Sequence, residues 1–390
     1  MAAPTIRPRN REPLGRYVVV LNCPSGDADA VIRRWVGGGV ARSSDFGGEP
    51  PVWPAGGDSL LLDRLGIAIV RPDPDRMMAM AADRIEGVVS VEPEVAVYAT
   101  GGGSGEVAAE QGLTWGLRAI GADAATSRGA GIKVAVLDTG VALDHPGLAG
   151  RIDLTASFIE GETAADGNGH GTHCAGTIGG ADAPDGLRYG VAPEVRLMIG
   201  KVLSDEGRGG TGSVLAGINW AIENGADIVS MSLGSPASEK RPFSPAYEQA
   251  ARVALQNGTL MVAAAGNDSE RPEKLAPVGD PASCPSVVAV AALDRDLAVA
   301  AFSNAGLRGE GAEIDLAAPG VDIFSAWPAP DLHRRISGTS MATPHVAGAA
   351  ALYASARSLR GRALWDALVA AARDLDLPAR DVGAGLVRCP

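Results

Sequence analysis

The sequence predicts an α/β fold, a parallel sheet with helices on both faces, preceded by a small α+β domain. Short apolar runs alternate with helix-like stretches over roughly the last two thirds of the 390 residues. This alternation is typical of parallel strands that are buried on both faces. A GGGSG tract at 101–105 has the composition of a flexible linker and separates this region from the first hundred residues. The sequence therefore divides into a smaller and a larger unit.

The first hundred residues have the order β-α-β-α-β, which predicts a compact module. Its runs of valine, isoleucine and tyrosine are typical of strands, and glycine and proline interrupt them. The expected segments are a strand at 16–22, a helix at 27–35, a loop at 37–58, extended runs at 59–70, a methionine-bearing helix at 73–85 and a strand at 88–99.

The region after the linker is predicted to form the parallel sheet and its covering helices. Strands are expected at 133–138, 195–203, 226–233, 259–266 and 286–293, and helices at 170–180, 211–224, 246–257, 341–355 and 358–375. The predicted organisation is a disordered tail at 1–15, the small domain at 16–100, a flexible linker at 101–112 and the main domain at 113–390.

The overall charge argues against two classes of partner. The net charge is −12 and the isoelectric point is near 5, so neither nucleic acid nor an anionic membrane is expected to bind. The sequence contains no run of 18 apolar residues, so no membrane span is predicted. The first residues also lack the apolar stretch of a signal peptide. The expected location is cytoplasmic unless the start is truncated or export follows another route, so the compartment stays open.

Cysteine spacing predicts no metal site. None of the four cysteines, at positions 23, 174, 284 and 389, stands in a CxxC or other zinc-binding spacing. Free thiols are expected rather than a disulfide framework.

Three polar residues stand in glycine-rich surroundings that let backbones approach closely. Asp138 ends the apolar strand in VAVLDTGV, His170 opens GNGHGTHCAGTI, and Ser340 lies in SGTSMATPHVAG. Open α/β sheets carry functional groups at the carboxyl ends of their strands, where Asp138 is expected. Ser340 is expected at a helix N-terminus, where free N–H groups favour an anion. Pro344 is expected within the first turn, where its missing N–H removes no helical bond.

These residue types together point to nucleophilic catalysis. A serine hydroxyl needs a base to take its proton, and His170 is the candidate for that base. Asp138 would fix the tautomer of the imidazole and stabilise the imidazolium. Asn267, in AAAGND at the end of a strand, and the backbone N–H of Ser340 are the candidate donors to a developing oxyanion.

Each of these residues has a simpler interpretation when taken alone. Asp138 could cap a turn, Ser340 could cap a helix, and His170 could bind a metal with His173. No third ligand is placed near the two histidines. Pepsin-like aspartic proteases need two Asp-Ser/Thr-Gly loops, and this sequence has only DTG at 138–140. The set of motifs therefore favours the serine mechanism.

Five motifs in a fixed order carry a family resemblance. DTGV, HGTHCAGTI, SLG, AAAGN and GTSMATPHVAG resemble the subtilisin-like serine proteases, over about 115–387. The resemblance implies a subtilisin-like fold, serine endopeptidase activity on polypeptides, triad roles for Asp138, His170 and Ser340, and an oxyanion role for Asn267. It further implies that two edge segments bind substrate backbone by β-augmentation and that a third segment lines the pocket for the residue before the cut. The edge segments are Gly207, Arg208 and Gly209, and Ser232, Leu233 and Gly234; the pocket segment is Ala264, Ala265 and Gly266.

The first domain resembles the inhibitory propeptide of the same family, a ferredoxin-like β-α-β-β-α-β module. VSVEPEVAVYAT matches the usual end of that module. The resemblance implies a zymogen whose own N-terminal domain is an intramolecular inhibitor, with self-cleavage at about 98–105. A protease dedicated to one precursor, a permanently inhibited zymogen and a non-catalytic binding protein are the competing hypotheses.

Two departures from the family pattern concern metals and thiols. The strong calcium site of the family uses an aspartate soon after the catalytic one, but this sequence has Gly147 there, in DHPGL. The loop ADAPDGLRYG does not match the remaining ligands either. We therefore expect no required cofactor and no strong calcium site, while calcium elsewhere stays open. Cys174 resembles the free cysteine of the proteinase K branch, which implies sensitivity to mercurials.

Overall fold

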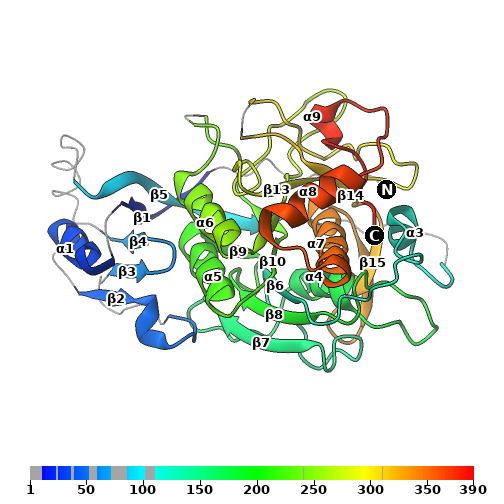
Figure 1. Cartoon of the computed structure of the whole chain (residues 1–390), viewed down its shortest axis with the longest axis horizontal. Helices are drawn as coiled ribbons and strands as arrows, with labels where there is room; N and C mark the ends of the chain where they lie inside the picture. Colours follow the sequence, from blue (N-terminus) through cyan, green and yellow to red (C-terminus); the bar gives the residue numbers. More distant parts are fainter. Residues whose placement is uncertain are drawn as a thin grey trace.

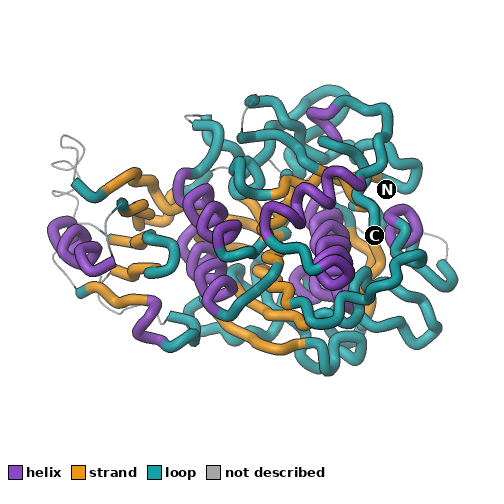
Figure 2. Tube along the Cα trace, viewed as in Figure 1, coloured by secondary structure: helices purple, strands orange, loops and turns teal. Residues whose placement is uncertain are grey.

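The computed structural model describes residues 11–22, 25–36, 39–51, 59–71, 86–101, 110–239, 241–309 and 311–390. It contains two large sheets, one in the first hundred residues and one in the rest of the chain (Figure 1). Loops, drawn teal in Figure 2, make up much of the larger unit on the side away from the first sheet. The expected helix at 73–85 and the residues 102–109 of the linker lie outside the described residues.

The larger sheet confirms the predicted α/β class. Its neighbouring strands all run parallel in the order β14-β13-β12-β10-β6-β8-β7. Apart from the edge strand β7, their side chains are almost fully buried, as expected from strands that read as continuous apolar runs. The strands are β6 (Lys133–Asp138), β7 (Ile152–Ser157), β8 (Arg196–Lys201), β10 (Ile228–Met231), β12 (Leu260–Ala264), β13 (Val288–Leu293) and β14 (Leu316–Pro319).

Helices cover both faces of this sheet, as predicted. One face is covered by α4 (His170–Gly179) and α7 (Thr339–Arg357), which also pack on each other. The opposite face is covered by α5 (Thr211–Glu223) and α6 (Pro245–Gln256). The remaining elements are α3 (Trp115–Ile120), α8 (Gly361–Ala371), α9 (Ala379–Val382) and the hairpin of β15 (Ile323–Ala326) with β16 (His333–Ile336).

The smaller sheet is antiparallel apart from one edge pair. Its strands follow the order β5-β1-β4-β3-β2, of which β5-β1-β4-β3 is the order of a ferredoxin-like module. The elements are β1 (Pro13–Leu21), α1 (Ser25–Val36), β2 (Val40–Arg42), a short 3₁₀ helix η1 (Ser43–Phe46), β3 (Ser59–Leu62), β4 (Ile67–Val70) and β5 (Val88–Ala99).

Three expectations for this part of the chain were wrong in detail. Residues from 13 onwards belong to β1 rather than to a disordered tail, because they pair with β5. The predicted loop at 37–58 contains β2, which pairs with β3. The run at 59–70 is two strands, because the chain turns at Gly66, whose φ of 64° is in the left-handed region that glycine tolerates.

Strand β5 belongs to both halves of the molecule. Its first part pairs with β1, and its last residues continue into the larger unit. There they lie between two short strands, β9 (Arg208–Gly210) on one side and β11 (Leu233–Gly234) on the other. The smaller sheet also contacts α5 and α6, so these two helices lie between the sheets (Figure 1).

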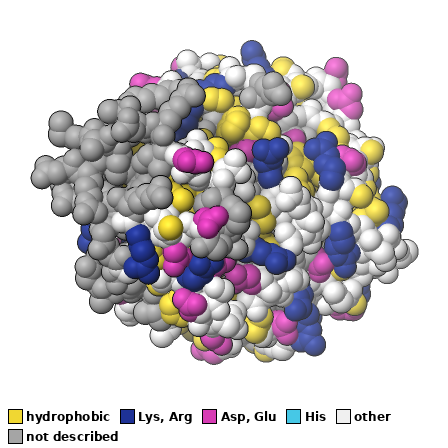
Figure 3. All heavy atoms as spheres, turned by 60° about the vertical axis from the view of Figure 1, so that its left-hand side comes forward, with side chains coloured by type: hydrophobic (Ala, Val, Ile, Leu, Met, Phe, Trp, Pro, Cys, Tyr) yellow, Lys and Arg dark blue, Asp and Glu magenta, His cyan; other side chains and the backbone are white. Residues whose placement is uncertain are grey.

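The face of the molecule shown in Figure 3 carries charged side chains of both signs. In Figure 3, acidic and basic side chains are interspersed and do not gather into an area of one sign. Within the described ranges, no helix combines the length and the apolar character needed to cross a membrane.

Candidate active site

The first two candidate residues meet where the sheet and a helix come together. Asp138 ends β6 and His170 begins α4, and the Nδ1 atom of His170 lies 2.7 Å from Oδ1 of Asp138. Both side chains are buried. The turn before His170 depends on Gly169, which has a φ of 101° and would collide with Trp327 if it carried a Cβ. This glycine lets the chain turn sharply, so that the imidazole reaches the end of β6.

A buried carboxylate that sequence reasoning missed holds this corner together. Oδ1 of Asp166 accepts hydrogen bonds from the Thr139 hydroxyl at 2.9 Å and from the Gly169 N–H at 2.8 Å. Its Oδ2 accepts from the backbone N–H of Thr172 at 2.9 Å and from the Thr172 hydroxyl at 2.6 Å. Asp166 therefore ties the residue after Asp138 to the first turn of α4. The only signal in the sequence is its place four residues before His170.

The electrostatics of the two histidines of α4 differ. Burial alone would favour the neutral ring of His170, but the adjacent Asp138 carboxylate raises the pKa of His170 well above 6.5. Burial lowers the pKa of His173 to about 3, and its Nε2 lies 2.9 Å from the carbonyl of Ile323. His173 is therefore neutral, and its Nε2 is occupied by the carbonyl of Ile323. This arrangement does not support the alternative of a metal held by His170 and His173.

Cys174 lies behind the imidazole, one helical turn after it. Its Sγ is 3.9 Å from Nδ1 of His170, and ligand atoms of Asp138, His170 and Cys174 all lie within 4.8 Å of one another. Burial raises the pKa of the Cys174 thiol, so the thiol form is favoured. Cys174, Cys284 and Cys389 are free thiols, whereas Cys23 lies outside the described residues. Inhibition by mercurials stays a prediction.

Ser340 is the second residue of α7 and is fully buried. Its hydroxyl donates a hydrogen bond of 2.9 Å to the carbonyl of Ser232. It also lies 2.5 Å from the hydroxyl of Thr100, which comes from the N-terminal part of the chain. Nε2 of His170 has no hydrogen-bond partner among the described residues. In this state the serine therefore contacts the N-terminal segment rather than the imidazole.

The position of Pro344 corrects an expectation. Helix α7 begins at Thr339, so Pro344 is past the first turn and its missing N–H does remove a helical bond. The carbonyl left without that bond belongs to Ser340. It accepts a hydrogen bond of 2.8 Å from the hydroxyl of Ser232, with the Cys174 thiol at 3.7 Å. The proline therefore frees a carbonyl that ties α7 to the segment at 232–234.

Asn267 lies directly beside the serine. Its Oδ1 accepts hydrogen bonds from the backbone N–H and the hydroxyl of Thr339, at 2.9 and 2.8 Å. Its Nδ2 is buried and has no partner among the described residues. The Thr100 carbonyl and Nδ2 of Asn267 both lie within 3.1 Å of where a Cβ on Gly338 would stand. A buried unpaired donor costs about 1–3 kcal/mol, so Nδ2 of Asn267 is a candidate donor to a bound group.

The two predicted edge segments flank residues of the chain itself. Tyr98 pairs with Arg208 on one side and with Gly234 on the other. Val97 pairs with Gly209, Ala99 pairs with Leu233, and the Ala99 N–H donates to the carbonyl of Gly207 at 3.0 Å. Ser232 differs from its neighbours, because its carbonyl and hydroxyl both contact Ser340. Residues 96–99 thus lie as a strand between both edges.

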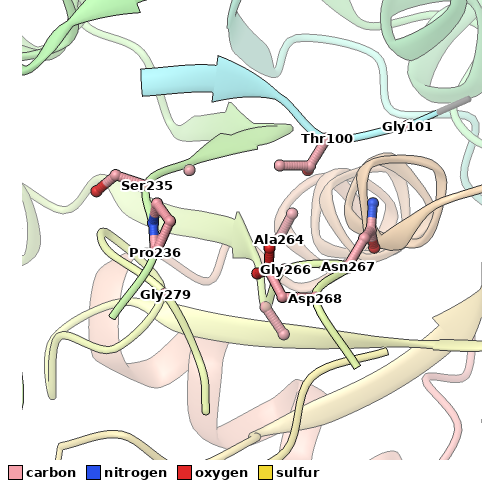
Figure 4. A pocket seen from close by; sticks show the side chains of 11 residues that line it. Thr100, Gly101, Ser235, Pro236, Ala264, Gly266, Asn267, Asp268 and Gly279 are labelled. Atoms are coloured by element: carbon pink, nitrogen blue, oxygen red, sulfur yellow. The ribbon is translucent and has the colours of Figure 1, made fainter. Parts of the chain in front are cut away.

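A cavity of about 50 Å³ opens beside Thr100 (Figure 4). The predicted pocket residues Ala264, Ala265 and Gly266 line it. Sequence reasoning missed several others, because they come from loops that are distant in sequence. The full lining is Thr100, Gly101, Gly234, Ser235, Pro236, Ala264, Ala265, Gly266, Asn267, Asp268 and Gly279.

Two buried glutamates of β5 cap helices of the larger unit. Oε1 of Glu94 accepts a 3.0 Å hydrogen bond from the N–H of Gly212, in the first turn of α5, while Arg16 pairs with the same carboxylate. Oε1 of Glu92 accepts from the Ser244 hydroxyl at 2.6 Å and from the Ala246 N–H at 3.0 Å, at the start of α6. Helix N-termini favour anions, so both contacts hold the N-terminal sheet on the larger unit.

The residues around Gly147 do not fit the strong calcium site that the family resemblance implies. A side chain at Gly147 would collide with the hydroxyl of Tyr189, whose side chain is buried. Around Tyr189, the ring of His333 lies at 5.4 Å and that of Phe324 at 5.9 Å, in edge-on contacts. Calcium needs six to eight oxygen ligands, and this space is filled by rings instead.

Comparison with known proteins gives one matching family and several similar relatives. The model of a family described as the subtilase family matches residues 129–385. Subtilisin DY from Bacillus licheniformis is 42% identical over 249 residues, which is 63% of this chain and 85% of that protein. Subtilisin Savinase from Lederbergia lenta is 43% identical over 246 residues, 62% of this chain and 84% of that protein. An alkaline protease from Shouchella clausii is 38% identical over 294 residues, 74% of this chain and 69% of that protein.

Proposed function

This chain belongs to the subtilase family and is a serine-type endopeptidase, and on that premise we propose that Asp138, His170 and Ser340 are its catalytic triad. The hydrogen bond between His170 and Asp138 supports this assignment. Asn267 is proposed as the oxyanion donor, on the strength of its buried and unpaired Nδ2.

In the proposed reaction, Ser340 attacks the peptide carbonyl that occupies the place of the Thr100 carbonyl. Its hydroxyl first turns from Ser232 towards Nε2 of His170, which takes the proton, while Asp138 stabilises the imidazolium. Asn267 Nδ2 and the Ser340 N–H donate to the oxyanion. Losing one such donor costs roughly 2.7–4 kcal/mol, a figure that comes from subtilisin. His170 then protonates the leaving amine, and water hydrolyses the acyl-enzyme.

We further propose that the chain is a self-inhibited zymogen. The observation that carries this proposal is the 2.5 Å contact between the hydroxyls of Thr100 and Ser340, made while residues 96–99 pair with both edge segments. The proposed inhibitor is the domain at 16–100, extended to the start of β1 at Pro13, and the catalytic domain is 113–390. A polypeptide substrate would replace residues 96–101 in the same groove.

The strand pairing predicts which bond the enzyme cuts first. Tyr98 and Ala99 are the last residues of β5 that pair with an edge segment. Thr100 follows them and lies next to the pocket, with its hydroxyl against that of Ser340. Gly101 then lies over Nε2 of His170. The intact 390-residue chain, incubated and followed by mass spectrometry, should yield fragments that end at Thr100 and begin at Gly101. A sample blocked with a fluorophosphonate should stay intact. A first cut elsewhere would contradict this register.

We propose that no calcium ion beside Gly147 is needed to stabilise this fold. Since Tyr189 fills the space beside Gly147, we expect EDTA to leave the unfolding midpoint within about 2 °C of its value in calcium, as measured by calorimetry. Tyr189→Ala should lower the midpoint equally with and without EDTA, because the ring, and not an ion, supports this region. A large loss in EDTA alone would show that a calcium ion stabilises the fold.

A further inference from the structure

Lys201, the last residue of β8, has a fully buried side chain, which is rare for a lysine unless it is paired. Its ammonium donates to the Thr139 carbonyl at 2.6 Å and to Oδ1 of Asp205 at 2.7 Å, and it lies 3.0 Å from Oε2 of Glu162. An ammonium has three donors, so the three oxygens satisfy it. The mechanism given above does not use this group.

Each partner of Lys201 belongs to a segment that carries a different part of the site. Thr139 directly follows Asp138. Glu162 lies in the loop at 158–169 that leads into His170. Asp205 lies between β8 and the edge strand β9. One buried cation therefore connects the acid, the base and a substrate-binding edge.

Further hydrogen bonds join the same segments around Asp205. Its Oδ1 also accepts from the N–H of Gly167 at 3.0 Å, and its backbone carbonyl accepts from Nδ2 of Asn168 at 2.9 Å. Oδ1 of Asn168 in turn accepts from the N–H of His170 at 3.3 Å. The hydrogen bond from Lys201 lowers the pKa of the Asp205 carboxyl, which keeps that partner charged.

We infer that Lys201 is a positioning residue, which holds Asp138, the loop before His170 and edge strand β9 in one arrangement. This inference rests on the proposed triad. Asp205 and Glu162 are partly exposed, whereas the ammonium is buried, so the lysine is the fixed centre to which the loops attach. Without it, the Thr139 carbonyl loses its ammonium donor and two carboxylates repel each other. Misplacement of about 1 Å in an active site can cost 10²-fold in rate.

The test compares two substrates on processed enzyme, with active sites counted by fluorophosphonate labelling. A four-residue peptide amide spans strand β9, whereas a one-residue ester does not reach it. Lys201→Met should lower kcat/KM per labelled site roughly 100-fold for the peptide and roughly 10-fold for the ester. Lys133→Met is the matched control, since Lys133 stands at the opposite end of neighbouring β6, and it should change neither value.

A purely structural lysine would give a different result. In that case Lys201→Met would lower the unfolding midpoint but leave both rates per labelled site at the wild-type value. An equal fall for both substrates would also overturn the inference, because β9 would then not be involved. Asp205→Asn should weaken the peptide reaction less, and adding it to Lys201→Met should cost little more, because both act through one contact.

Hydrogen exchange separates failure of this inference from failure of the triad. In an intact Ser340→Ala chain, Lys201→Met should raise amide exchange at least about tenfold in 158–169 and 204–210, while β12 stays protected. If the wild-type enzyme never labels with the fluorophosphonate, the proposed triad is wrong, and this exchange measurement still decides the role of Lys201. Unchanged exchange in both segments would overturn it. Asp205→Asn in the same background serves if Lys201→Met does not fold.

Discussion

A chain with Ser340→Ala is expected to remain a single polypeptide of 390 residues for as long as the wild-type chain needs to process itself completely. The substitution removes the oxygen that lies 2.5 Å from the Thr100 hydroxyl and leaves the rest of the groove intact. Activity on peptide substrates should fall about 10⁶-fold, the loss known for the nucleophile of subtilisin. Gel electrophoresis and mass spectrometry measure processing, an added peptide substrate measures activity, and fluorophosphonate labelling reports whether the reactive serine is present.

The control for this variant lies on the same helix. Ser355 donates its hydroxyl to the carbonyl of Ala130, far along α7 from the site. Ser355→Ala should process itself and label like the wild type. If Ser340→Ala still cuts itself at the wild-type rate, another residue is the nucleophile.

Replacing both Glu92 and Glu94 by alanine should release the protease from its N-terminal domain soon after the first cut. Both carboxylates are buried and accept hydrogen bonds from backbone N–H groups at the starts of α5 and α6. A hydrogen bond to a charged group contributes about 1.5–3 kcal/mol. Losing two such contacts, together about 4 kcal/mol, should weaken inhibition roughly a thousand-fold.

The measurement is the delay between self-cleavage and the appearance of activity on an added peptide. In the wild type, activity should lag well behind the cut, because the cleaved domain stays bound. In the double variant, the two should coincide at micromolar protein. Glu49→Ala is the control, since Glu49 is exposed on the same domain, and it should keep the lag. A double variant with the wild-type lag would show that other contacts hold the inhibitor.

Buried strands and the linked motifs were the parts of this molecule that could be predicted from sequence. Parallel strands at the centre of the sheet are apolar throughout, so their runs stand out. The two edge strands did not stand out: β7 has exposed polar residues, and β14 is only four residues long and ends in Pro319. Strand β2 was missed because a three-residue strand carries almost no periodicity.

The supporting residues of the site could not be predicted for a different reason. Asp166 and Lys201 act through hydrogen bonds to residues up to 62 positions away, and only the folded topology brings those partners together. Pro344 was misjudged because the start of α7 lies at Thr339, a boundary that the sequence does not mark with a capping side chain. Reactive residues stand in recognisable motifs, whereas the residues that orient them stand in no motif that the sequence alone reveals.

Strand β5 pairs both with β1 of the N-terminal sheet and with the short edge strands β9 and β11, so the proposed inhibition should depend on dilution. While the chain is intact, the tail is tethered beside the groove at an effective concentration in the millimolar range, so no added substrate competes well. The proposed cut would remove this tether, whereas the strand pairing with Arg208 and Gly234 seen in the intact chain should persist. Inhibition then becomes an ordinary bimolecular equilibrium. The same cleaved molecules should be inactive in concentrated solution and active when dilute. The protein concentration, and not only the cleavage itself, should then determine when the protease becomes active.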